Sequence, residues 1–184
     1  MKRVAVLLLA ALAVLACVGC GSQKKESKYA QALDVLSAVE DAYEEGDRFA
    51  IYGGDQEHAV MDAPGTFDVT RTEEMGFTLG LPQSQFSNVE DAASMIHMMN
   101  ANTFTGAAYR LKDGTDVKTF ADEAKDNILA TQWMCGIPDT LLIVNVDGTY
   151  VITAYGEAGI METFKNNALS VFEEAEILVE TPVS

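Results

Sequence analysis

The sequence predicts an α+β protein whose C-terminal part is a ferredoxin-like βαββαβ unit, with both helices on one face of an antiparallel sheet. Two observations lead to this fold. After Thr103, strand-like apolar runs and helix-like apolar stripes alternate in the order strand, helix, strand, strand, helix, strand. Asp147-Gly148, between the two central runs, is a strong signal for a two-residue hairpin turn.

The elements of this unit follow from residue type and spacing. Strands are expected at 103–111, 140–146, 149–155 and 177–179, where β-branched and aromatic residues are concentrated. A helix is expected from Thr115 or Asp116, the candidate N-cap, and a second between the last two strands. Their apolar stripes are Val117, Phe120, Ala121, Ala124, Ile128 and Leu129 in the first, and Ile160, Phe164, Ala168, Val171 and Phe172 in the second.

The part before this unit, residues 29–102, reads as helical and irregular. An apolar stripe predicts a helix over 27–45, with Gly46 as its C-cap. A short strand is expected at 48–52, and 70–81 fits either a helix or a strand. Ser87 and Glu90 have capping-box spacing, which predicts another helix from Ser87 to about Asn100. We expect both parts to belong to a single exported domain, 29–184.

The first residues have the layout of a signal peptide, predicted over 1–19. Met1-Lys2-Arg3 is followed by an apolar run from Val4 to Ala16, which is shorter than the roughly 20 residues of a membrane-spanning helix. Small residues then precede a cysteine twice, a pattern that resembles the bacterial lipobox, in which the new N-terminal cysteine carries a diacylglycerol.

Two cysteines compete for that role. Cys17 has the better residue three places before it, Val14, whereas Cys20 is followed at once by a polar tether over 20–28. We expect lipidation of Cys20, with Cys17 as the alternative and an ordinary cleaved signal as the other interpretation. The protein is then expected to be anchored through membrane lipid at the extracytoplasmic face of the cell membrane.

The charge balance restricts the possible partners. The chain has a net charge of −16, and from Tyr29 onward it holds 27 acidic and seven basic residues. Such a body is not a nucleic-acid binder, because phosphates must be neutralised by positive charge. The acidic surface indicates either simple solubility or a cationic partner.

Two stretches carry a family resemblance: Asp91 to Thr105 (DAASMIHMMNANTFT) and Trp133 to Asp139 (WMCGIPD). They resemble an uncharacterised small lipoprotein family of clostridia-like Gram-positive bacteria and, more distantly, a domain of unknown function common in such lipoproteins. The resemblance spans roughly Phe49 to Val179. It implies a fold and a location, and it carries no activity.

The segment Thr131 to Asp139 is the most distinctive local feature, with Trp133, Met134, Cys135 and Gly136 as possible interaction or structural residues. It is longer than a helix-to-strand connection requires. We expect it to support the fold, with Trp133 buried against the sheet and Cys135 as a small buried hydrophobe. The competing interpretation is a thiol site, although redox exchange needs a second cysteine that is lacking here.

Other candidate sites are weaker. Asp55, Glu57, His58 and Asp62 group ligand-type side chains without the spacing of a calcium loop. Met95 to Met99 includes His97 and could suggest copper, but its adjacent side chains point in different directions. The sequence has neither a Gly-x-Ser-x-Gly elbow nor a Gly-rich phosphate loop, so we expect no metal and no cofactor.

These observations favour a non-enzymatic accessory or binding module, with an unknown protein partner possible. The alternatives are a cryptic thiol-dependent enzyme that uses Cys135, and a surface protein that binds cations or peptides.

Overall fold

A computed structural model describes residues 27–183. The predicted signal peptide, Cys17, Cys20 and the first part of the tether lie outside these residues. Within 27–183, no helix combines the length and apolar character needed to cross a membrane.

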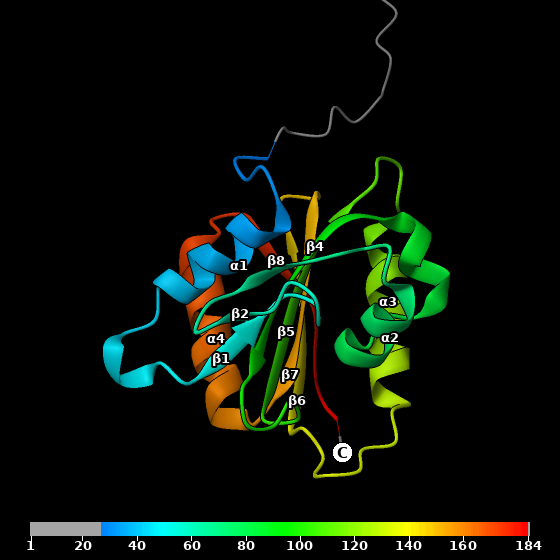
Figure 1. The fold of residues 1–184 in the computed structure, drawn as a ribbon. Helices are drawn as coiled ribbons and strands as arrows, with labels where there is room; N and C mark the ends of the chain where they lie inside the picture. Colours follow the sequence, from blue (N-terminus) through cyan, green and yellow to red (C-terminus); the bar gives the residue numbers. More distant parts are fainter. Residues whose placement is uncertain (1–26, 184) are drawn as a thin grey trace, which may run out of the picture.

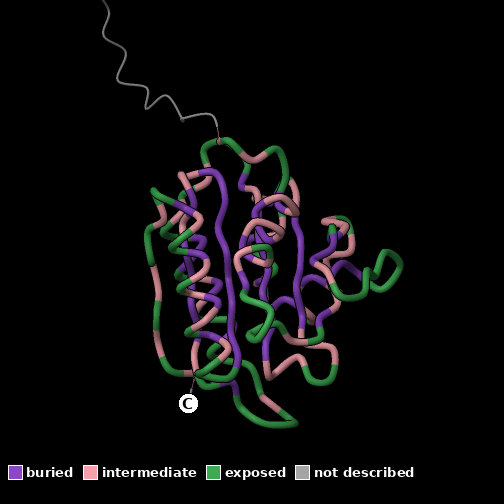
Figure 2. Tube along the Cα trace, turned by 90° about the vertical axis from the view of Figure 1, so that its left-hand side faces the viewer, coloured by how far each residue is buried: buried purple, intermediate pink, exposed green. Residues whose placement is uncertain are grey.

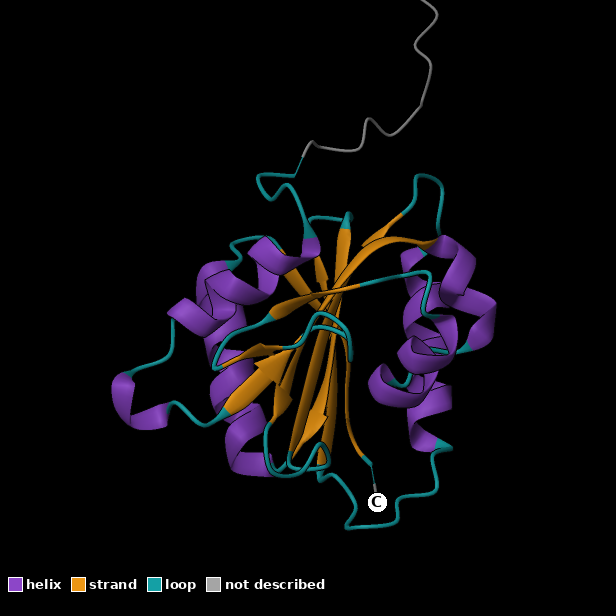
Figure 3. Cartoon of the chain, in the orientation of Figure 1, coloured by secondary structure: helices purple, strands orange, loops and turns teal. Residues whose placement is uncertain are grey.

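The chain forms an α+β fold around one antiparallel sheet of eight strands (Figures 1 and 3). In chain order the strands are β1 Ile51–Gly53, β2 Val60–Met61, β3 Gly65–Phe67, β4 Val89–His97, β5 Phe104–Leu111, β6 Thr140–Val146, β7 Tyr150–Gly156 and β8 Ala175–Pro182. They lie in the order β2-β1-β4-β5-β7-β6-β8, and β3 pairs with β4 beside this path.

Four α-helices cover the sheet within the described residues. They are α1 Ala32–Asp41, α2 Thr72–Leu79, α3 Val117–Leu129 and α4 Ala158–Val171. Short 3-10 turns stand at Glu45–Asp47 (η1) and Gln83–Asn88 (η2). Figures 1 and 3 show α1 and α4 on one side of the sheet and α2 and α3 on the other.

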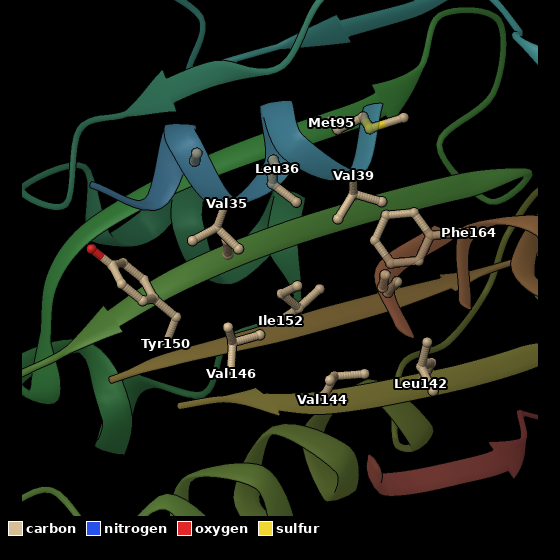
Figure 4. Packing of buried hydrophobic residues seen from close by; sticks show 14 of the residues in the cluster. Val35, Leu36, Val39, Met95, Leu142, Val144, Val146, Tyr150, Ile152 and Phe164 are labelled. Carbon is tan, nitrogen blue, oxygen red and sulfur yellow. The ribbon is translucent and has the colours of Figure 1, made fainter. Parts of the chain in front are cut away.

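Each face of the sheet has its own hydrophobic core. The α1/α4 face buries Val35, Leu36, Val39 and Phe164 against inward-pointing strand residues (Figure 4). The α2/α3 face buries Met75, Leu79, Phe120, Ala124 and Ile128. Strand β6 serves both cores by the two-residue period of a strand, since Leu142, Val144 and Val146 face α1/α4 whereas Leu141 and Ile143 face α2/α3.

Burial therefore runs through the central strands β4 to β7, and much of the exposure lies in the connections at the two ends of the sheet (Figure 2). Most of the predicted elements after Thr103 are confirmed at nearly the expected bounds. The Asp116 carboxylate accepts the Thr119 N–H at 2.7 Å and so caps α3 as predicted.

The predicted helix from Ser87 to Asn100 is wrong. Ser87 lies in the 3-10 turn η2, and Val89 to His97 forms β4, which is paired with β5 along its length. Both faces of β4 are buried, by α1 on one side and by the α2/α3 core on the other. A strand buried on both faces loses the apolar/polar alternation that identifies strands, and the spacing of Ala92, Ala93 and Ile96 then fits a helix equally well.

The ferredoxin-like arrangement is not confirmed, because the strand count exceeds it and the helices lie on both faces. In that fold the last strand would lie beside the first, here β5, but that edge of β5 is occupied by β4. Strand β8 instead pairs with β6. The crossovers β5-α3-β6 and β7-α4-β8 start from strands that are antiparallel to each other, and both lead toward the β8 edge of the sheet. Because such crossovers are right-handed, their two helices have to lie on opposite faces.

The β6–β7 hairpin turn has the predicted geometry. Asp147 and Gly148 have φ of 54° and 76°, as a type I′ turn requires, and the Thr149 N–H donates to the Val146 carbonyl at 3.2 Å. A Cβ on Gly148 would meet no atom within 4 Å, so a substitution there is limited by backbone conformation alone.

We therefore expect Gly148→Ala to lower the free energy of unfolding by about 1 kcal/mol, the cost of a left-handed conformation for an L-residue. Gly159→Ala is the matched control, because Gly159 also has open space around it but lies in the first turn of α4. That substitution should be neutral or stabilising by up to about 1 kcal/mol. Urea unfolding of both variants tests this, and equal effects would contradict the strain argument.

Candidate functional site

A groove of about 1120 Å³ lies at one end of the sheet. Its walls come from α2, from the connection between β4 and β5, and from the segment Thr131 to Asp139; Tyr155 at the end of β7 also lines it. Aromatic, uncharged polar and charged side chains all contribute. The residues that line it include Gln56, Arg71, Glu73, Glu74, Phe77, Asn100, Asn102, Gln132, Trp133, Met134, Cys135 and Tyr155.

The ends of the segment Thr131 to Asp139 are held by hydrogen bonds. The Thr131 N–H donates to the Ile128 carbonyl at 3.2 Å, and the Asp139 N–H donates to the Gly156 carbonyl at 2.9 Å. The Asp139 carboxylate also accepts the Ala158 N–H at 2.9 Å, at the start of α4. In the middle, Asn102 Nδ2 donates to the Gly136 carbonyl at 2.7 Å, which joins the segment to the β4–β5 connection.

Trp133 turns inward from this segment, as predicted. Its ring is partly buried on the α2/α3 core and lies 5.3 Å from the Tyr155 ring, tilted by 55°. The indole Nε1 is buried and donates to no acceptor in the described part of the chain. Trp133 thus contributes apolar contact without a compensating hydrogen bond.

Met134 and Cys135 point outward, and the expectation that Cys135 is a small buried hydrophobe is wrong. Met134 is 93% exposed, and the Cys135 thiol is free and exposed. Gly136 has a φ of 111°, a conformation that favours glycine and that turns the chain back toward Asn102. The four predicted residues therefore divide into one that packs, two that face the groove and solvent, and one that makes the turn.

The wall formed by α2 carries an exposed aromatic side chain that sequence reasoning missed. Phe77 on α2 is 94% exposed and lines the groove, although it belongs to a helix whose Met75 and Leu79 are fully buried. A large apolar side chain on the solvent face of a short amphipathic helix could have been noticed as a signal. The ambiguity of 70–81 between helix and strand hid it.

The grouped acids and histidine at 55–62 organise the adjacent loop. Asp55 is only 1% exposed, and its carboxylate accepts backbone N–H groups from Glu57 at 2.9 Å, His58 at 3.2 Å and Asp68 at 3.0 Å. The His58 Nδ1 lies 3.0 Å from the same carboxylate. Glu57 instead pairs with Arg71 at 2.9 Å, and Asp62 stands at a φ of 56°.

No group of three or more His, Cys, Asp or Glu side chains arranged for a metal ion occurs among residues 27–183. His97 ends β4, where its ring stacks on Phe49 at 5.6 Å and its Nδ1 accepts the Met99 and Asn100 N–H groups. Met95 is buried and Met99 is 81% exposed, so these side chains do not converge.

Neither histidine lines the groove that contains Cys135. A thiol nucleophile is activated by a nearby base, most often a histidine. The arrangement is therefore suited to contact with a ligand, through exposed apolar side chains beside amides and hydroxyls, more than to covalent chemistry.

Comparison with protein-family models, with curated proteins and with solved structures gave no significant match to this chain.

The groove and the tether lie at opposite ends of the sheet. Where the chain enters the fold, the Ser27 hydroxyl donates to the Asp147 carboxylate at 2.6 Å, and the Tyr150 hydroxyl donates to the Tyr29 carbonyl at 2.9 Å. These contacts fix Ser27 and Tyr29, where the described chain begins, beside the β6–β7 turn. Strand β7 runs from this turn to Tyr155 in the groove, and Figure 1 shows the blue chain start and the yellow loop after α3 at opposite ends.

The contribution of Trp133 to stability can be separated from that of its N–H group. Trp133→Ala should lower the free energy of unfolding by about 2 kcal/mol, less than for a fully buried tryptophan, because the ring is only partly covered. Trp133→Phe should cost less than about 1 kcal/mol, since it keeps the contact with Tyr155 and removes a buried donor that has no acceptor. Urea unfolding measures both. No loss in Trp133→Ala would mean that the ring does not stabilise the fold.

The buried carboxylate of Asp55 predicts a pH dependence. Burial by itself raises the pKa of Asp55, but hydrogen bonds from Asp68 N–H, His58 and Glu57 N–H outweigh it and lower the pKa to about 2. A lowered pKa contributes stability that is complete above the unfolded value near 4 and is lost as the pH falls through about 2.

Asp55→Asn should therefore destabilise the protein by about 2 kcal/mol or more at pH 7. The carboxamide keeps one acceptor oxygen, but its NH2 group replaces the other and turns a donor toward at least one of the three N–H groups. The difference from wild type should shrink between pH 4 and pH 2. Asp122→Asn on exposed α3, which removes only a surface ion pair with Lys125, is the control and should change little. If the difference in free energy of unfolding between Asp55→Asn and wild type stays constant down to pH 2, the lowered pKa of Asp55 is contradicted.

Proposed function

We propose that this protein is a lipid-anchored, extracytoplasmic binding module that presents the groove around Trp133, Met134 and Phe77 away from the membrane. The observation that carries the proposal is the position of the groove at the end of the sheet opposite to the tether contact of Ser27 with Asp147. A strand of seven residues, such as β7, spans about 20 Å, so the domain itself holds the groove off the membrane surface.

The anchor part of the proposal rests on the sequence before Ser27. The basic start, the apolar run and the small residues before Cys17 and Cys20 favour lipidation at one of these cysteines, and the resemblance to small lipoproteins of Gram-positive bacteria agrees with it. With the tether held at one end of the domain, a lipid on Cys20 would place the β6–β7 turn toward the membrane and the groove toward the exterior.

The binding part rests on the groove itself. Phe77 and Met134 are large apolar side chains left in solvent on opposite walls, at 94% and 93% exposure. Exposed apolar side chains that line an opening offer contact area to a ligand. The thiol enzyme is the weaker alternative, because Cys135 shares the groove with no histidine.

Cys135 allows a direct test, since it is the only cysteine after the two candidate anchor cysteines and its thiol is exposed. In intact cells with the wall removed, a membrane-impermeant maleimide should label the wild-type protein and not Cys135→Ser. The labelled protein should be found in the membrane fraction. Replacing Cys17 and Cys20 together by Ser should release the protein from that fraction; retention in high salt, with the signal cleaved, would refute the anchor.

The same thiol tests whether the groove is occupied. A benzophenone maleimide on Cys135 should give adducts on illumination in cells. A control protein, Cys135→Ser combined with Ser170→Cys, carries the probe at the exposed C-terminal end of α4 and should not give them. Identical adducts from both positions, or none from Cys135, would overturn the assignment of the groove as the binding surface.

A further inference from the structure

We infer that the ligand of the groove is an extended peptide segment in which a basic side chain neighbours a large apolar one. This inference rests on the proposed binding function and names its ligand class. Three features of the groove carry it: the charges of its walls, its exposed apolar side chains and the orientation of its aromatic rings.

Within residues 27–183, Arg71 is the cation that lines the groove, and it is already neutralised. Arg71 Nη1 lies 2.9 Å from Glu57 Oε1, its Nε lies 2.7 Å from Glu74 Oε2, and the buried Asp55 carboxylate lies 3.7 Å from the same Nε. Three carboxylates around one guanidinium leave an excess of negative charge. A phosphate, a carboxylate or an acidic sugar would find no free positive charge here, so anionic ligands are disfavoured.

Glu73 is the acid of the groove that we infer to be available to a ligand. It is exposed on α2, lines the groove, and forms no ion pair with another residue of 27–183. It lies four residues before Phe77, so the two side chains stand on the same face of the helix, one turn apart. A lysine or arginine can therefore pair with Glu73 while the neighbouring residue of the ligand contacts Phe77. The excess of acids over the whole body would attract such a ligand from a distance.

The two exposed walls suit apolar side chains of varied shape. Met134 is flexible and polarizable, and methionine is common on surfaces that accommodate different peptides. The amides of Gln56, Asn100 and Gln132 lie along the groove, where they can donate to and accept from a peptide main chain.

An oligosaccharide is the other ligand that amides and aromatic rings could serve. Sugar binding needs a flat aromatic face that is open to the ring of the sugar. Trp133 instead lies against Tyr155 at 5.3 Å with its indole N–H buried, so its ring belongs partly to the core. The most exposed apolar side chains of the groove are Phe77 and Met134. A flexible methionine adapts to peptide side chains and offers no flat face to a sugar ring.

The test uses the full lipidated chain in nanodiscs of phosphatidylcholine, a net neutral lipid, with empty nanodiscs as background. The probe is a fluorescein-labelled octapeptide that alternates lysine and leucine, and its binding is followed by fluorescence polarisation. Two matched peptides replace every lysine by glutamate or every leucine by serine. We expect binding of the first peptide, at least tenfold weaker binding of the other two, and no competition by a neutral chitin tetrasaccharide.

Variants separate the groove from the general acidity of the protein. Glu73→Gln should weaken the lysine-leucine peptide about fivefold, and Phe77→Ser about tenfold. Glu162→Gln and Leu169→Ser remove an exposed acid and an exposed apolar side chain from α4, on the other face of the sheet, and should leave the affinity unchanged. All four side chains are exposed, so the variants should fold, and equal thermal melting temperatures would verify it.

The inference is wrong if Glu162→Gln weakens binding as much as Glu73→Gln, since the contact is then charge attraction without a site. It is also wrong if the tetrasaccharide binds and competes, or if none of the peptides binds. In those cases adducts from Cys135 in cells would still support the groove as a binding surface with a different ligand. Absence of such adducts would refute the proposed function itself.

Discussion

The pairing of β4 with β5 is the constraint on which the rest of this fold depends. Strand β4 occupies the edge of β5 at which β8 would lie in a ferredoxin-like sheet, so β8 joins the sheet beside β6 instead. The second crossover then has to carry α4 over the face opposite to α3. Helix α1 joins α4 on that face, and α2 joins α3 on the other, so the sheet is covered twice and its central strands are buried on both sides.

How much of this could be predicted depends on whether the information is local. The turn at Asp147-Gly148, the cap at Asp116 and the stripe of α3 are set by neighbouring residues, and all three are confirmed. The strand β4 could not be recognised, because burial on both faces removes the alternation that would identify it. No local pattern in α4 determines which face of the sheet it covers. The face depends on which edge of the sheet is free for β8. Because β4 was predicted as a helix, the edge of β5 appeared to be free.

In the candidate site, too, the locally encoded part could be predicted and the part that depends on tertiary contacts could not. The segment Thr131 to Asp139 stood out by its length and its tryptophan, and the structure places it in the wall of the groove. Its partners, Phe77 and Arg71 on and before α2, lie more than fifty residues earlier in the chain, and only the tertiary fold brings them near. The sequence marked Asp55 as a metal-ligand type of residue. Its carboxylate instead accepts hydrogen bonds from backbone N–H groups, and no pattern of side chains reveals that role.

The two edges of the sheet offer little backbone for pairing with another chain. An exposed strand edge can pair with another chain, and proteins commonly blunt such edges with short strands, bulges, charges and proline. Here β2 has only two residues. Strand β8 has an irregular register opposite Ile143 and Val144, carries Glu176 and Glu180, and ends at Pro182. Phe77 and Met134, the most exposed of the large apolar side chains that line the groove, lie away from both edges. The contacts of Ser27 and Tyr29 are at the other end of the sheet, so they do not cover the groove.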